Sequence, residues 1–331
     1  MSVKNLHILI ACAMAVFLLI LSSCSSTGGY RSAEGGVWNT TYHITYRSGE
    51  DLHDSIRTVM KRVEMSLSPF ADSSLISRIN RGENVAADSM LRQVFRTSQR
   101  INRESRGVFD PTVAPLVNLW GFGYRNEGVE PTQEAIDSML QTVGIGRCSL
   151  TPDGFVVRGH HDTEFNFSAI TKGYGCDLVA EMLRRNGVED YLVEIGGEIA
   201  LAGRSPRGRD WRVMVDAPVD CDTAIVHERM AVIELADGGV ATSGNYRNYK
   251  TTPEGRVWHT ISPVTGRPAV TDILSATVIA PSCMEADAYA TSCMAIGSAE
   301  ALAIMDSIPG VEALVVTADT ILRTSGFPTA R

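Results

Sequence analysis

Apolar and polar positions follow two different patterns in the two halves of this chain. In the first half, apolar residues recur every three or four positions over 52–65, 88–104 and 131–143, a spacing that predicts amphipathic helices. Because proline favours the first helical position, we expect Pro131 to open the third of them. The stretch GVFDPTVAPLVNLWGFG (107–123) is rich in Gly, Pro and aromatic residues, which predicts an ordered but irregular segment.

The second half consists mostly of short apolar runs bounded by turn residues. A helix is expected from about Lys172 to Asn186 with Gly187 as its stop, followed by a hairpin, YLVEIGGEIALAG, that turns at Gly-Gly. Further helices are expected over 281–297 and 298–307, and strands over 211–216, 230–236, 256–261, 273–280, 311–317 and 321–325. Because these strands outnumber the helices and follow one another directly, the pattern favours an α+β fold with largely antiparallel sheets and packed helices.

The N-terminal residues have a pattern of their own. Lys4 precedes a short apolar run that ends in Leu-Ser-Ser-Cys24. This order predicts an export signal over 1–23, and the cysteine resembles the lipidated residue of bacterial lipoproteins. The alternative is a transmembrane anchor, which needs about 20 apolar residues, more than this run offers. Residues 24–36 are rich in Ser and Gly and are expected to form a flexible tether, which leaves 37–331 as the folded domain.

Composition narrows the classes of function. The net charge is −8 and no basic run is longer than two residues, as at Arg184-Arg185, so nothing indicates binding to nucleic acid. Beyond Cys12 and Cys24 the chain has five cysteines, an odd number without a CxxC pair, and this argues against a zinc site or a disulfide framework. No Gly-rich phosphate loop of the strand-to-helix type is present.

One expected helix carries an unusual polar pair. In PSCMEADAYATSCMAIG, Asp287 and Thr291 are four residues apart and therefore share one helical face. Hard oxygen ligands one turn apart suit Mg²⁺. The simpler alternative is that the hydroxyl of Thr291 bonds back to a main-chain carbonyl, while the helix dipole favours Asp287. From the spacing alone, both interpretations stay open.

Three other stretches are candidates for chemistry. His259 ends an expected strand just before the turn SPVTG, where it could be a general base or a core histidine. Lys172 lies at the expected start of a helix, a position that favours anion binding. The stretch DGGVATSGNYRNY (237–249) predicts a tight turn.

Eight motifs occur together and in order along the chain. They are NTTYHITY (39–46), SPFADSSLISRIN (68–80), GVFDPTVAPLVNLWGFG, SAITKGYGCD (168–177), EIGGEIALAG (194–203), ATSGNYRNY (241–249), HTISPVTGRP (259–268) and ADAYATS (286–292). In this series the chain, from about Val37 onward, resembles the FAD:protein FMN transferases of the ApbE family. It departs from the family pattern at Trp38-Asn39, where a Met is usual, at Asn166, where Asp is usual, and at Ser262, which is often Asp.

The resemblance implies an ApbE-like, T-fold-like domain with FAD in a central cleft. It also implies a Mg²⁺ ion held by Asp287, Thr291 and the main-chain carbonyl of Ala169. His259 is expected to be the base that activates an acceptor hydroxyl, and Trp120 is left as a packing residue. The residues implied to line FAD are Trp38, Phe70, Val108, Phe109, Asp110, Asn166, Lys172 and Ile261. Aromatic faces suit flavin or adenine rings, and a lysine suits phosphate.

The implied reaction is transfer of FMN from FAD to a Thr or Ser hydroxyl of another protein, with release of AMP. The family's acceptors are subunits of membrane redox complexes, such as the sodium-pumping NADH:quinone oxidoreductase and the RNF complex. A protein of the cell envelope that is lipid-anchored to the membrane at Cys24 and faces the periplasm would meet them. Two alternatives remain, a non-catalytic FAD-binding lipoprotein and a Mg²⁺-dependent FAD pyrophosphatase. An intact His259 and a complete set of metal ligands disfavour the first, and only an assay separates the second.

Overall fold

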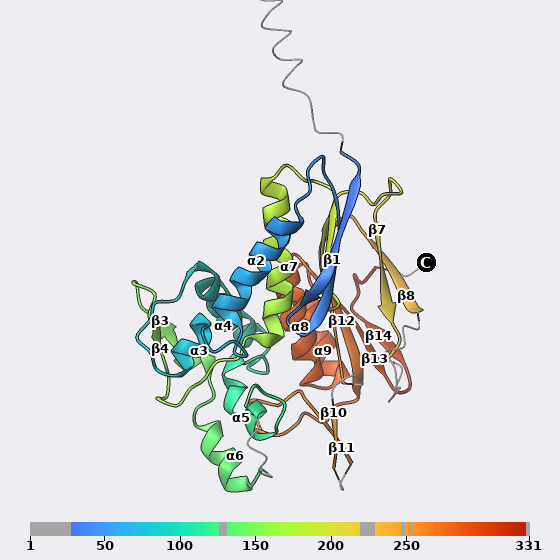
Figure 1. The fold of residues 1–331 in the computed structure, drawn as a ribbon. Helices are drawn as coiled ribbons and strands as arrows, with labels where there is room; N and C mark the ends of the chain where they lie inside the picture. Colours follow the sequence, from blue (N-terminus) through green and yellow to red (C-terminus); the bar gives the residue numbers. More distant parts are fainter. Residues whose placement is uncertain (1–27, 126–130, 219–228, 246–248, 253–254, 329–331) are drawn as a thin grey trace, which may run out of the picture.

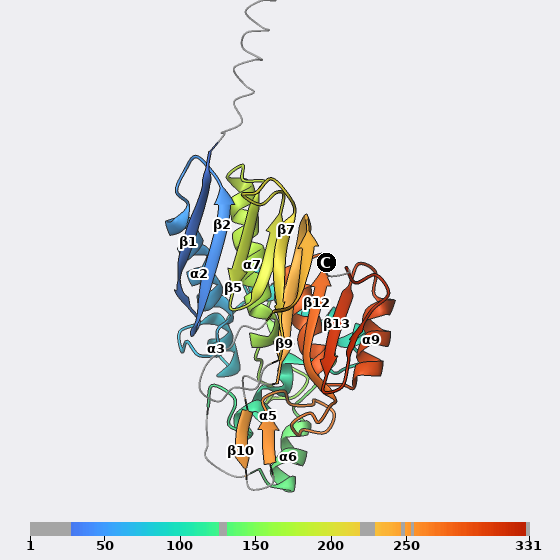
Figure 2. The same cartoon turned by 90° about the vertical axis from the view of Figure 1, so that its right-hand side faces the viewer.

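An antiparallel sheet forms the centre of the fold (Figures 1 and 2). The computed structural model describes residues 28–125, 131–218, 229–245, 249–252 and 255–328. Within these residues the sheet has eight strands, which in spatial order are β1 (Tyr30–Val37), β2 (Thr40–Arg47), β5 (Tyr191–Ile195), β6 (Glu198–Ala202), β9 (Asp237–Gly244), β12 (Ile273–Ala280), β13 (Glu312–Thr317) and β14 (Ile321–Arg323). Neighbouring strands pair antiparallel throughout, as the succession of short apolar runs predicts.

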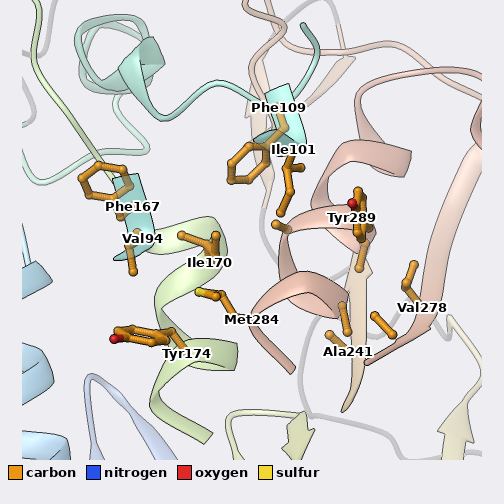
Figure 3. Close-up of a cluster of buried hydrophobic side chains, with 14 of the residues drawn as sticks. Val94, Ile101, Phe109, Phe167, Ile170, Tyr174, Ala241, Val278, Met284 and Tyr289 are labelled. Carbon is orange, nitrogen blue, oxygen red and sulfur yellow. The ribbon is translucent and has the colours of Figure 1, made fainter. Parts of the chain in front are cut away.

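Helices cover one face of this sheet, and a small second sheet covers the other (Figure 1). The helices next to the sheet are α2 (His53–Leu67), α7 (Ser168–Arg185), α8 (Cys283–Met294) and α9 (Ser298–Ser307). Figure 3 shows part of the largest core cluster, in which Ile170 and Tyr174 of α7 lie beside Met284 of α8. On the opposite face, β7 (Trp211–Asp216) and β8 (Arg229–Leu235) bury their apolar side chains against the central strands.

The remaining elements surround the helical face and the lower end of the sheet. The helices are α3 (Leu75–Asn80), α4 (Ser89–Glu104), the 3-10 turn η1 (Pro111–Val113), α5 (Ala114–Leu119), α6 (Gln133–Leu140) and the 3-10 turn η2 (Ile145–Arg147). The strand pairs are β3 (Ser149–Leu150) with β4 (Val156–Val157), and β10 (Tyr249–Thr252) with β11 (Gly255–Trp258). Figures 1 and 2 both place α5, α6 and the β10–β11 hairpin at the end of the molecule opposite to the start of β1.

Most predicted elements are confirmed. The strands expected at 211–216 and 273–280 and the helix expected at 298–307 have those bounds in the structure, and the Gly-Gly hairpin joins β5 to β6. Gly187 ends α7 with a φ of +74°, the left-handed conformation that glycine allows. Cys148, Cys176, Cys283 and Cys293 are buried free thiols.

Several expectations are wrong. Residues 30–36 of the predicted tether belong to β1, which pairs along its whole length with β2, so this pairing outweighs the Gly and Ser content. The expected turn at 237–249 is largely the central strand β9. Helix α7 begins at Ser168, so Lys172 lies in its second turn, away from the free N–H groups of the first.

Smaller corrections concern the segments between α4 and α7. The stretch 107–123 contains η1 and α5, and each of them has one proline in its first turn, where proline is favoured. Pro131 precedes α6 without opening it, because the side chain of Thr132 caps that helix by accepting the amide of Ala135. The predicted export signal and Cys24 lie outside the described residues. In the part of the chain that is described, no helix is long and apolar enough to cross a bilayer.

Candidate active site

Helices α7 and α8 cross in close contact, and a glycine permits this approach. A Cβ at Gly173 would overlap the carbonyl oxygen of Cys283 and lie 2.8 Å from the Cβ of Asp287. The carboxylate of Asp177 then fixes the start of α8, because it accepts the amides of Cys283 at 2.9 Å and Met284 at 2.8 Å. Together these contacts orient α8 so that Asp287 faces α7.

Asp287 is 3% exposed, and its Oδ2 accepts the amide of Gly173 at 3.0 Å. In regular α-helical geometry the same N–H faces the carbonyl four residues earlier, which is that of Ala169. Two of the three expected metal ligands, the carboxylate of Asp287 and the carbonyl of Ala169, therefore lie next to the N–H of Gly173. On the next turn of α8, the Oγ1 atom of Thr291 lies 3.4 Å from the Oγ of Ser243 on β9. The back-bond to a carbonyl that was considered for Thr291 is instead made by its neighbour Ser292, to Ala288.

A residue that sequence reasoning missed completes this cluster. The ammonium of Lys172 forms an ion pair with Glu198, which is 3% exposed on β6, and also interacts electrostatically with Asp287. The second oxygen of Glu198, Oε2, is buried and has no hydrogen-bond partner among the described residues. Its signal in the sequence is a glutamate at a buried position of an otherwise apolar strand, directly after the Gly-Gly turn.

Burial makes it costly to keep all three charged groups of this cluster ionised. Burial raises the pKa of Glu198 and of Asp287, and the nearby Lys172 ammonium opposes both shifts. For Lys172 burial acts to lower the pKa, but the two carboxylates together raise it above its usual value. With all three groups ionised, one negative charge is left in excess, and an uncompensated buried charge is costly.

These residues fit a magnesium ion. The donor set expected from the sequence consists of a carboxylate, a hydroxyl and a main-chain carbonyl, which are hard oxygen ligands of the kind that Mg²⁺ takes. A divalent cation would also compensate the excess negative charge of the cluster. The Oε2 atom of Glu198, which has no hydrogen-bond partner among the described residues, is a further oxygen acceptor in the same place. We call the group Lys172, Glu198 and Asp287, together with Thr291, the carboxylate cluster.

Trp38 packs against α7 near Gly175, one turn beyond Lys172. It forms the β1–β2 turn with Asn39, and φ angles of +47° and +59° at the two residues place both in the left-handed region typical of two-residue hairpins. The indole packs on α7 so closely that a Cβ at Gly175 would lie 2.5 Å from it. Its Nε1 atom is buried without a partner among the described residues, which leaves one donor for a ligand.

Other residues expected to line FAD have structural roles in the fold. Phe109 is buried in the largest core cluster (Figure 3), and Ile261 packs with Leu116 and Ile136. Asp110 is buried and accepts hydrogen bonds from Thr112 and from the amide of Ile145 at 3.0 Å. Burial raises the pKa of this carboxyl, while these hydrogen bonds act to lower it.

Three further expected residues remain accessible to different degrees. Phe70 is 61% exposed and meets the ring of Tyr124 edge-on at 6.1 Å between centroids. Val108 is half-buried at the turn that follows α4. Asn166 is half-buried before α7, where its Oδ1 accepts the amide of Ser168 at 2.9 Å. The neutral side chain at this position therefore helps to start the helix that carries Lys172.

His259 follows β11 and meets the ring of Phe122 edge-on, with 6.5 Å between the centroids. The chain that carries it leaves the central sheet after Gly244 and returns at β12, where Gly244 pairs with Ser275. The neighbouring Ser243 is the residue that contacts Thr291. The excursion that holds His259 therefore leaves and rejoins the sheet next to the carboxylate cluster. Trp120 has the packing role expected of it and donates its indole N–H to the carbonyl of Gly266 at 2.9 Å.

An FAD cleft stays a prediction. A surface cavity of about 630 Å³ is lined by Ser89, Arg92, Gln93, Arg96 and Thr97 of α4, and it includes none of the residues discussed above.

The ApbE family model matches residues 38–315 of this chain. The chain belongs to the ApbE family. An FAD:protein FMN transferase of Vibrio cholerae is 35% identical to it over 301 residues, which cover 88% of each protein. That of Escherichia coli K12 is 32% identical over 275 residues, covering 81% of this chain and 77% of the relative.

Solved ApbE structures share this fold. Flavin transferase ApbE from Vibrio cholerae matches with a TM-score of 0.79 and 32% identity, covering 90% of this chain and 98% of that one. The apo form of the flavinyl transferase ApbE from Pseudomonas stutzeri matches with a TM-score of 0.80 and 30% identity, covering 89% and 95%. The ApbE resemblance and the α+β fold class expected from the sequence are thus confirmed.

Proposed function

We propose that this ApbE-family chain is a Mg²⁺-dependent FAD:protein FMN transferase, which moves FMN from FAD to a Thr or Ser hydroxyl and releases AMP. The observation that carries the proposal is the carboxylate cluster. It crowds two buried carboxylates, one ammonium and one hydroxyl at a helix crossing, in the fold of relatives that bear this name. Such a cluster suits a cation and a phosphate group.

The residues divide the chemistry between them. Asp287, Thr291 and the carbonyl of Ala169 would hold Mg²⁺, which when bound would neutralise charge on the pyrophosphate of FAD. The ammonium of Lys172, oriented by Glu198, is available for a phosphate oxygen. His259 accepts the proton of the acceptor hydroxyl. The hydroxyl oxygen then forms a bond to the phosphorus of the FMN moiety, and the bond from that phosphorus to the AMP oxygen breaks.

The location and the partners of the enzyme belong to the same proposal. A lipid anchor at Cys24 would hold the enzyme at the membrane on the periplasmic side of the cell envelope, where subunits of membrane redox complexes would be its acceptors. The N-terminal sequence pattern supports this placement. Cys24→Ser should release the protein into the soluble envelope fraction. A variant that stays in the membrane with an uncleaved N-terminus would indicate a transmembrane anchor.

One experiment tests the activity. The purified protein is incubated with FAD, Mg²⁺ and candidate acceptor domains, AMP is quantified, and flavin attached to the acceptor is detected by in-gel fluorescence. Transfer requires AMP and labelled acceptor in equal amounts. AMP without labelling identifies an FAD pyrophosphatase, and FAD binding with neither product identifies a binding protein.

A further inference from the structure

The excursion that carries His259 has a charge opposite to that of the whole chain. Residues 245–271 contain four cationic residues and one acidic residue, Glu254. The complete chain has 30 cationic and 38 acidic residues and a net charge of −8. The remainder of the protein therefore has 26 cationic and 37 acidic residues, so the segment that contains the expected base is net positive in a chain that is net acidic. A segregation of this kind can steer a charged partner toward one surface.

Two of these cations are placed with neutral partners. The Nζ of Lys250 on β10 lies 3.2 Å from the carbonyl oxygen of Trp120 and 5.0 Å from the ring centroid of Phe122. The guanidinium of Arg267 donates to the side-chain oxygen of Gln133. These partners among the described residues carry no negative charge, and both cationic side chains are exposed at the surface, where an acidic group can reach them.

Trp120 contacts both segments that carry these two cations. Its carbonyl oxygen accepts a hydrogen bond from Lys250, and its indole N–H donates to the carbonyl of Gly266, the residue before Arg267. The positions of the hairpin and of the 262–267 turn are thus both set by the end of α5. Phe122, which lies under Lys250, is also the ring that His259 meets edge-on. The cation Lys250 and the expected base His259 therefore both contact the ring of Phe122.

Exposed apolar side chains flank Arg267 in the sequence. Val264 is 69% exposed in the turn before Arg267, and Val270 is 92% exposed just after it. Apolar side chains at this level of exposure gain free energy when a partner covers them. Residues that would hold Mg²⁺ and phosphate lie elsewhere, on α7, α8 and β6. This surface, defined as Lys250, Arg267, Val264, Val270 and Phe122, is called the acceptor rim below.

We propose that the acceptor rim docks the acceptor protein, through a segment that presents acidic and apolar side chains next to the hydroxyl that receives FMN. The inference rests on the proposed function and names the surface that selects the second substrate. Acidic side chains would meet Lys250 and Arg267, and the valines would be covered. The net negative charge of the rest of the enzyme would weaken non-specific association with an acidic partner, because like charges repel. Figures 1 and 2 place the hairpin and α5, between which Lys250 contacts Trp120, at the end of the molecule opposite to the start of β1.

The test reverses charge on the rim and measures binding separately from chemistry. The variant is Lys250→Glu with Arg267→Glu. Its matched control is Arg57→Glu with Arg323→Glu, which changes net charge equally at exposed positions of α2 and β14. The probes are two soluble domains with one acceptor threonine, flanked by Asp and Glu in the first and by Asn and Gln in the second. Binding of the fluorescein-labelled domains is followed by anisotropy, and FMN transfer and AMP release by assay.

We expect the rim variant to raise the Kd and the KM of the acidic domain about ten-fold or more at low salt, since each reversed charge removes an attraction and adds a repulsion. The KM for FAD and the AMP released without acceptor should change less than about two-fold, and the control should behave like the wild type. Rising salt should erase the difference.

Three results would overturn the proposal. The first is that the wild type binds the acidic and the neutral domain equally well. The second is that the rim variant binds the acidic domain with an unchanged Kd. The third is that the rim variant loses only affinity for FAD, which would show that these cations bind the nucleotide. Binding is measured without FAD, so a wild type that binds the acidic domain yet labels nothing would refute the transferase activity and leave the rim supported.

Discussion

The two halves of the candidate active site are built in different ways. The carboxylate cluster lies on α7, α8 and β6, where packed core residues surround it and Asp287 is 3% exposed. His259, in contrast, is half-buried beside Phe122, on an excursion from the sheet that also carries the exposed Val264 and Val270. A rigid half suits a cation and a phosphate that must be held in fixed geometry. A surface half suits a protein substrate that arrives from solution and leaves again.

The largest expected effect is on the rigid half. Asp287→Ala removes the carboxylate that compensates both the ammonium of Lys172 and the proposed cation, so Mg²⁺-dependent FMN transfer should be abolished. The protein should stay folded, because the helix crossing depends on Gly173 and Asp177. Circular dichroism and transfer are measured side by side. Ser292→Ala is the control on the same helix, since it removes only a hydrogen bond to Ala288. Undiminished transfer by a folded Asp287→Ala protein would remove this residue from the site.

A smaller loss is expected on the surface half. His259→Ala should still bind FAD, because the phosphate and metal contacts lie on the other half. Transfer should fall by roughly 10²–10⁴-fold, the usual contribution of a general base. FAD affinity, AMP release and acceptor labelling are followed on the same variant. The control, His161→Ala, removes a surface histidine of the loop before α7. If His259→Ala labels the acceptor at a near-normal rate, the histidine has only a packing role.

The rigid half should also depend on close packing. A Cβ at residue 173 would overlap the carbonyl of Cys283, so Gly173→Ala should force α7 and α8 apart. We expect a loss of about 3 kcal/mol or more in the free energy of unfolding, the upper range for overpacking, with weaker transfer. Gly146→Ala is the matched control, because its new Cβ would meet no atom within 4 Å. Denaturant unfolding measures both. Equal stability of the two variants would show that the crossing can relax without cost.

Sequence patterns predicted the rigid half better than the surface half. Asp287 and Thr291 share a face because helical spacing is regular, and apolar runs such as 273–280 gave strand bounds that the structure confirms. Glu198 was missed, because its partner Lys172 is 26 residues away and only the fold brings them together. Phe109 is a core residue, and its expected place in the lining of FAD stays a prediction, since an aromatic side chain suits both environments equally.

Local turn chemistry also misled where tertiary pairing decided the outcome. The glycines and serines of 237–244 predict a turn, yet this segment is β9, held between β6 and β12. Gly239 is required there for another reason, since a Cβ would collide with the start of α8. The same holds for 30–36, where pairing with β2 outweighs a composition typical of a tether. These errors share one cause, which is that contacts far apart in sequence cannot be seen in a local pattern.

The smallest expected effect concerns the carboxylate that joins α7 to α8. Burial raises the pKa of Asp177 from 3.8 to about 6, although the amides of Met284 and Cys283 act to lower it. A raised pKa in the folded state means that the native protein binds more protons than the unfolded chain between these two values. The contribution to stability is therefore complete below about pH 4 and is lost as the pH rises through about 6, by up to roughly 3 kcal/mol.

Asp177→Asn removes this titration while its amide oxygen can still accept one of the two amides. Relative to the wild type, the variant should therefore gain free energy of unfolding as the pH rises from 4 to 7, as denaturant unfolding at several pH values would measure. Asp306→Asn is the control with the opposite sign, because hydrogen bonds from Ser325 hold the pKa of Asp306 below its usual value. A helix N-terminus favours an ionised carboxylate, so a deficit of Asp177→Asn that grows with pH would show that the α8 dipole outweighs burial at this crossing.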